Sequence, residues 1–121
     1  TSILAAGSKV GIALPPPPAA TQTAFGKSYD SNRSRDRYLR NYNALVRELI
    51  SVFSERTVEN IHVISSNAVV DPMTSFPVTT EALNANNAAT VTVQNNAVHP
   101  SSEGYGQITD LYRCWVKSFE A

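Results

Sequence analysis

The chain has few of the residues on which many small proteins depend, since its 121 residues include one cysteine, one methionine and one tryptophan. The single cysteine, Cys114, excludes an internal disulfide and a zinc site built on several cysteines. Its position beside Trp115 in a helical pattern predicts a small packing residue. Charged residues make up 17% of the chain and the net charge is zero, which removes the electrostatic argument for a nucleic-acid or anionic-membrane partner.

Long hydrophobic runs are also missing. The apolar stretches are much shorter than the roughly 20 residues that a transmembrane helix requires. No basic segment followed by an apolar one opens the chain, so no secretory signal is recognised and the compartment stays open. Neither a metal nor another cofactor is expected.

What the sequence does contain is an alternation of strand and helix patterns. The apolar run "VGIAL", residues 10–14, is typical of a strand that is covered on both faces of a parallel sheet. Pro15 to Pro18 end this strand and predict a stiff, extended arm. The residues before Gly7 resemble the last turn of a helix. Because a domain rarely begins in mid-helix, residues 1–121 are interpreted as the C-terminal part of a single larger domain.

Two helices and a second strand are predicted further along the chain. Apolar residues at three- and four-residue spacing predict helices from about Arg33 to Ser54 and from about Ser102 to Phe119. "NIHVISS", residues 60–66, predicts the second strand, in which His62 is structural or exposed. Two polar segments, residues 19–36 and 71–94, are predicted as long irregular loops. Within the second loop, "ATVTVQ" could form a short strand or edge ribbon.

The order strand, helix, strand, helix favours an α/β fold with a parallel sheet and helices on its faces. Ligands of such sheets bind beyond the carboxyl ends of the strands. Both long loops follow predicted strands, so both should lie at that edge together with His99, which comes just before the last helix.

His99 is the candidate that the sequence singles out for chemistry. Pro100 restricts His99 to an extended backbone conformation, and Ser101 or Ser102 can cap the helix that follows. The imidazole is therefore presented by a backbone with little freedom, as a general base must be. A structural role for a histidine near a helix start remains the alternative.

The segment "NAVHPSSEGYGQITDLYRCWV" resembles the last block of the SGNH (GDSL-type) hydrolases, in which Asp-x-x-His-Pro leads into the final helix. "KVGIALPPPPAATQTAFG", "RYLRNYNALVRELI" and "NIHVIS" extend the resemblance to the C-terminal half of such domains as found in bacteriophage tail proteins. The resemblance implies part of a three-layer α/β/α SGNH-hydrolase-like fold with a parallel sheet. It also implies a serine ester hydrolase, often one that removes O-acetyl groups from surface glycans, with His99 as general base.

Two departures from the family pattern concern the catalytic groups. The family's acid position, three residues before the histidine, is occupied by Asn96. Either the site is impaired or another group orients His99, for which a backbone carbonyl and Asp71 are candidates; the alternative for Asp71 is a turn residue before Pro72. The nucleophile block and the oxyanion-hole blocks of the family are absent, and Ser8 lies at the wrong end of its strand to replace the nucleophile.

Two classes of function follow from the resemblance. In the first, the chain supplies His99 to an esterase whose nucleophile lies on a cleaved segment or another chain, namely the N-terminal part of the same domain. In the second, a decayed SGNH-like module binds glycan or serves as a tail-protein scaffold. The loop after the proline arm would rim the pocket, with Phe25 and Tyr29 as candidate substrate-binding residues. A virion or extracellular location would fit, and homo-oligomerisation stays open.

Overall fold

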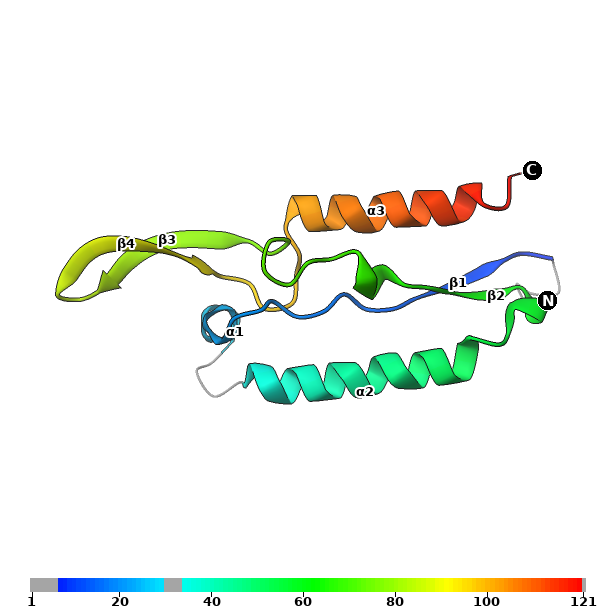
Figure 1. Cartoon of the computed structure of the whole chain (residues 1–121), viewed down its shortest axis with the longest axis horizontal. Coiled ribbons are helices and arrows are strands. Elements are labelled where there is room, and N and C mark those ends of the chain that lie inside the picture. Colours follow the sequence, from blue (N-terminus) through cyan, green and yellow to red (C-terminus); the bar gives the residue numbers. More distant parts are fainter. Residues whose placement is uncertain (1–6, 30–33, 121) are drawn as a thin grey trace.

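The computed structural model describes residues 7–29 and 34–120, and it has mixed α/β structure, as predicted (Figure 1). The elements in chain order are β1 (Val10–Ala13), α1 (Gln22–Ser28), α2 (Arg35–Phe53), β2 (Ile61–Ile64), β3 (Val78–Asn84), β4 (Asn87–Gln94) and α3 (Ser102–Lys117). Short 3-10 helices lie at Thr57–Glu59 and Ser66–Ala68. The expected helical turn before Gly7 lies outside the described residues; Gly7 itself has a φ of 74°, a conformation that favours glycine.

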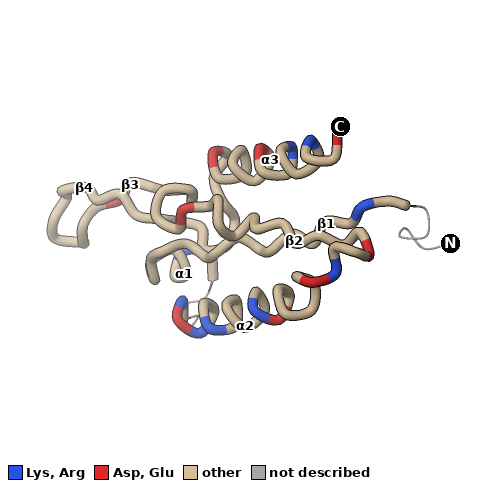
Figure 2. The backbone as a smooth tube through the Cα atoms, turned by 45° about the vertical axis from the view of Figure 1, so that its right-hand side comes forward, with Lys and Arg blue, Asp and Glu red and all other residues tan. Residues whose placement is uncertain are grey.

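Strands β1 and β2 form a two-stranded parallel sheet, in a register that runs from Val10 opposite Ile61 to Ala13 opposite Ile64. Both strands were predicted from their apolar runs. Helices α2 and α3 lie on opposite sides of this pair and run back antiparallel to the strands (Figures 1 and 2). On the α3 side, Gly11 leaves room for a neighbour, because a Cβ at this position would lie 3.1 Å from the Trp115 ring.

Both long helices begin where a serine supplies an N-terminal cap. The side chain of Ser34 accepts from the Arg37 N–H at the start of α2, and that of Ser101 accepts from the Gly104 N–H at the start of α3. The predicted bounds of these helices are confirmed to within two residues, apart from the part of the first prediction that falls on the undescribed Arg33. Cys114 is exposed, so its prediction as a packing residue is wrong.

The prediction of an irregular loop over residues 19–36 is wrong in part, because this segment contains helix α1. Thr21 caps the helix by accepting from the Ala24 N–H, and Tyr29 ends it by donating its own backbone N–H to the Phe25 carbonyl. Ala24 and Phe25 are fully buried, and their burial stabilises a helix of seven residues that would be marginal by itself.

The prediction of a second irregular loop, over residues 71–94, is also wrong in part. Strands β3 and β4 form an antiparallel hairpin over most of this segment, with Val78 opposite Gln94 and Asn84 opposite Asn87. The suggested strand at "ATVTVQ" is confirmed as the greater part of β4. At the tight turn, the Asn84 side-chain oxygen accepts from the Asn86 N–H. This hydrogen bond stabilises a hairpin turn that lacks the usual glycine.

The main hydrophobic cluster lies beyond the carboxyl ends of β1 and β2. Its buried members come from the loops, α1 and the start of α3: Ala19, Ala24, Phe25, Val70, Phe76, Ala97 and Ile108. Many large apolar side chains elsewhere on α2 and α3 are exposed, among them Leu45, Ile50, Val52 and Val116. No helix in the described part of the chain is long and apolar enough to cross a membrane.

Candidate active site

The segment that carries His99 is joined to both loops that follow the parallel strands. The Ala97 carbonyl accepts from the N–H of Ala19, in the segment after β1, at 2.9 Å. The Ser101 N–H donates to the carbonyl of Ser75, in the segment after β2, at 2.8 Å. The three segments therefore meet at the carboxyl edge of the β1–β2 pair, where the strand order predicted a site.

The backbone at His99 is held on both sides. The Asn96 side-chain oxygen accepts from the N–H groups of Val98 and His99, at 3.1 and 2.9 Å. Pro100 is buried, and Ser101 caps α3 immediately afterwards. His99 itself is exposed, and no hydrogen bond within residues 7–29 and 34–120 involves its imidazole. An imidazole placed in this way is open to a proton donor that approaches from solvent or from another chain.

Asn96 therefore acts on the backbone of the histidine segment. Its side-chain oxygen forms an Asx turn across residues 96–99 and holds the chain in the bend that leads into α3. That oxygen accepts from two backbone N–H groups, and no hydrogen bond within the described residues joins it to the imidazole. The position at which the SGNH family has an acid thus has a structural role in this chain.

Asp71 has a similar local role. Its side-chain oxygen accepts from the N–H groups of Met73 and Thr74, at 2.7 and 3.2 Å, which is the pattern of a turn residue before a proline. These contacts agree with the alternative interpretation of Asp71, that of a turn residue before Pro72. Among the described residues, no hydrogen bond joins Asp71 to His99.

The turn that Asp71 begins is packed against the first turn of α3 through Ser75. The Ser75 hydroxyl accepts from the Asp71 N–H at 3.2 Å and donates to the Gln107 side-chain oxygen at 3.0 Å. Gly104 allows this close approach, because a Cβ there would lie 2.7 Å from the Ser75 carbonyl oxygen and 2.7 Å from the Pro100 Cβ. Ser75 and Gly104 thus set the position of the helix that His99 precedes.

A buried glutamine links the segments that follow β1 and β2 through hydrogen bonds. Gln94, 5% exposed, accepts from the N–H and the hydroxyl of Thr21, both at 3.0 Å. Its side-chain nitrogen donates to the carbonyls of Pro72 and Met73, at 2.7 and 3.1 Å. Sequence reasoning missed both Gln94 and Ser75, because a polar residue inside a Thr- and Asn-rich segment has no signal that separates a buried network from a solvated loop.

The structure corrects the expectation that Phe25 contacts a substrate. Phe25 is 1% exposed, and its ring lies in the main cluster with its centroid 5.5 Å from that of Tyr38. A side chain with no accessible surface cannot contact a ligand without local unfolding. Tyr29 is half-buried against the same cluster, with its ring centroid 6.2 Å from that of Phe25, and its role in binding stays a prediction.

One acidic residue follows the exposed histidine closely in the sequence and lies in helix α3. Glu103 is in the first turn of α3, and hydrogen bonds from its own backbone N–H and from the Ser101 hydroxyl lower the pKa of its carboxyl. Ser8 precedes β1 and so lies at the amino end of the sheet, away from the histidine segment. No group of three or more metal-binding side chains occurs in the described part of the chain.

Comparison with models of known protein families, with curated proteins and with solved structures finds no match to this chain.

Proposed function

We propose that this chain is the C-terminal part of a serine ester hydrolase of the SGNH type and that it supplies His99 as the general base. The observation that supports this most directly is the position of His99. It is exposed, its backbone is held by Asn96 and Pro100, and it lies at the carboxyl edge of a parallel β pair that has a helix on each side. In the proposed fold these elements are part of a three-layer α/β/α domain.

In the proposed reaction, the His99 imidazole accepts the proton of a serine hydroxyl while the serine oxygen forms a bond to the ester carbonyl carbon. The imidazolium then returns the proton to the leaving alcohol, and water releases the acyl group in a second step that uses the same base. The substrate class that the family resemblance supports is an ester, in particular an O-acetyl group on a surface glycan. No metal or other cofactor takes part.

The proposal requires a partner that supplies the serine nucleophile, namely the N-terminal part of the same domain on another chain or on a cleaved segment. Two features of the sheet support such a partner. The pair β1–β2 has fewer strands than an independently stable sheet normally has. In addition, an apolar groove of about 330 Å³ runs along β1 and α3, lined by Gly11, Ala13, Trp115 and Val116 among others.

The experiment is covalent labelling of the intact protein with a fluorophosphonate, together with hydrolysis of 4-nitrophenyl acetate. We expect the label on a serine of the partner segment, and we expect labelling and hydrolysis to be strongly reduced by His99→Ala. Identification of the labelled peptide by mass spectrometry locates the nucleophile. Unchanged labelling and hydrolysis in the variant would reject His99 as the base.

A second candidate function is favoured by the contacts of Asn96. Asn96 is a neutral amide whose side-chain oxygen accepts from two backbone N–H groups, so nothing acidic at the family position stabilises an imidazolium. The alternative is therefore a module of SGNH type that has lost catalysis and binds glycan or serves as a scaffold. Absence of fluorophosphonate labelling, together with retention of O-acetylated glycan on a column of the immobilised protein, would favour this alternative.

A further inference from the structure

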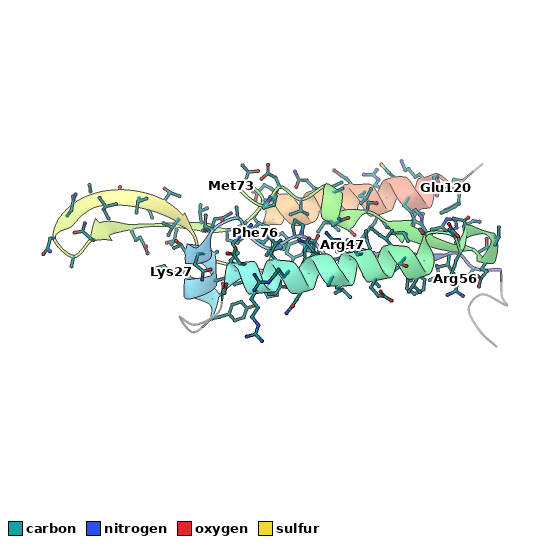
Figure 3. All side chains as sticks on the ribbon, turned by 60° about the horizontal axis from the view of Figure 1, so that its bottom comes forward. Lys27, Arg47, Arg56, Met73, Phe76 and Glu120 are labelled. Atoms are coloured by element: carbon teal, nitrogen blue, oxygen red, sulfur yellow. The ribbon has the colours of Figure 1, made fainter. Side chains whose placement is uncertain are left out.

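The β3–β4 hairpin projects from the body of the protein as an arm with a firmly attached base (Figure 1). At the base, Gln94 is held by the four hydrogen bonds described above, and the Asn95 N–H donates to the Pro77 carbonyl at 3.0 Å. Lys27 of α1, labelled in Figure 3, forms an ion pair with Glu81 of β3 at 2.5 Å. The direction of the arm is therefore set by the fold.

The outer part of the arm is uncovered. Every residue from Ala82 to Thr90 is exposed, and Leu83 is 54% exposed. A two-stranded hairpin without further strands or a covering layer is only marginally stable in water. A firmly attached arm of this kind therefore has a surface that suits a further β-strand.

The edge of β4 is open to such a strand. The Asn95 N–H donates to the Pro77 carbonyl, so hydrogen-bonded pairs alternate from that point along the hairpin. Thr90 and Thr92 consequently direct their backbone N–H and C=O groups away from β3, and no backbone hydrogen bond to the rest of the described chain uses them. Alternating Thr and Val residues in this strand also favour extended structure.

The lack of charge on β4 makes this edge suitable for a second copy of the same chain. Strand β4 has no charged residue, and the one charged residue of the hairpin, Glu81, is paired with Lys27 of the same chain (Figure 2). Natural edge strands that avoid self-pairing usually have exposed lysines, prolines or unpaired charges, and β4 has none of them. Two β4 strands can therefore approach each other about a two-fold axis without like-charge repulsion.

We propose that the β4 edge is a self-association surface that binds the β4 strand of a second copy of this chain in antiparallel orientation. The two hairpins then form a continuous four-stranded ribbon. In a register centred at Val91, Thr90 of one copy lies opposite Thr92 of the other, so the outward N–H and C=O groups satisfy one another. This surface is separate from His99, and its use does not depend on ester hydrolysis.

The test is Thr92→Pro in the intact protein, with Thr80→Pro as the matched control. Thr80 is opposite Thr92 in the hairpin register, and both positions direct their N–H groups outward, so neither proline removes a hydrogen bond within the hairpin. Molecular mass is measured by sedimentation equilibrium over a range of concentrations. We expect the wild type to dimerise, Thr92→Pro to weaken the dimer by about tenfold or more for the lost edge pairing, and Thr80→Pro to leave it unchanged.

Three results would overturn the proposal. A wild type that stays monomeric at tens of micromolar, or a Thr92→Pro variant that dimerises as the wild type does, would show that the β4 edge is not used. Equal weakening by both prolines would show that association does not depend on β4 in particular. Because the readout is mass, these results are independent of whether His99 catalyses ester hydrolysis.

Discussion

The two ends of the β1–β2 pair differ in how completely they are packed. At the carboxyl end, which we call the site end, the loops, α1 and the first turns of α3 enclose a continuous core around Phe25 and Phe76, which are 1% and 2% exposed. At the amino end, the sheet end, Phe119 is 37% exposed and Val116 is 51% exposed. The site end thus has its own core, whereas the sheet end leaves apolar surface open to further structure.

The difference shows why the candidate site is well defined although the sheet has two strands. His99 is positioned by contacts within the site end: the Asx turn of Asn96, the cap of Ser101 and the clamp of Ser75 on Gly104. None of these contacts depends on additional strands beside β1. The geometry of the histidine segment can therefore be tested separately from the completion of the sheet.

The largest effect is expected for chemistry at the site end. In the intact protein, His99→Ala should lower kcat/KM for 4-nitrophenyl acetate by about 10²- to 10⁴-fold, because the serine hydroxyl then lacks its base. The melting temperature should stay within about 1 °C, since the side chain is exposed and makes no hydrogen bond in the described chain. Activity equal to that of the wild type would contradict the proposed role.

The comparison of the two ends predicts different costs for the same substitution. Phe25→Ala should lower the free energy of unfolding by about 3–5 kcal/mol, because it leaves a cavity in a closed core. The matched control Phe119→Ala should cost markedly less, because its ring is already 37% exposed. Urea titration of the intact protein measures both. Equal losses would mean that the sheet end is packed as tightly as the site end.

The clamp between the 71–75 turn and α3 can be tested with a pair of glycines. Gly104→Ala should destabilise the chain by about 1–3 kcal/mol, because the new Cβ would lie within 2.7 Å of the Ser75 carbonyl oxygen and of Pro100. Gly106→Ala is the control in the same helix. It has no neighbouring atom within 4 Å of its Cβ position and should stabilise α3 by about 0.5–1 kcal/mol. Thermal melts of both variants measure these two changes in stability.

A smaller effect is expected for the residue that holds the histidine backbone. Asn96→Asp can keep one oxygen on the Val98 and His99 N–H groups and adds a carboxylate charge near the imidazole. We expect kcat to rise by about tenfold, since a carboxylate stabilises the imidazolium that forms in the transition state. The steady-state rate with 4-nitrophenyl acetate measures this, and an unchanged kcat would show that another group already orients His99.

The smallest effect concerns α2 at high pH. Burial, and then the neighbouring Tyr29, raise the pKa of Tyr38, so the neutral phenol is favoured in the folded state. The stability that follows is fully present below the unfolded pKa of 10.0 and is lost as pH rises through the folded pKa. Tyr38→Phe should therefore flatten the loss of stability above about pH 10 while leaving the value at pH 7 nearly unchanged. Urea midpoints between pH 7 and pH 11 check this.

The sequence by itself determined the elements whose pattern is local and long. Apolar runs predicted β1 and β2, apolar spacing predicted α2 and α3, and the His-Pro-Ser order predicted a serine-capped helix directly after the histidine. The location of the histidine segment at the carboxyl ends of β1 and β2 followed from the strand order alone. These predictions depend on backbone propensity and on the period of hydrophobic residues, both of which can be recognised without any partner.

Only the tertiary structure decided the rest. Helix α1 is too short to have a clear period, and it exists because Ala24 and Phe25 are buried against residues far along the chain. The hairpin lacks a glycine turn and depends on asparagine side chains and on Gln94 for its geometry. Asn96, Asp71 and Ser75 have the same polar character in sequence, and their different roles arise from which backbone groups the fold brings within hydrogen-bonding distance.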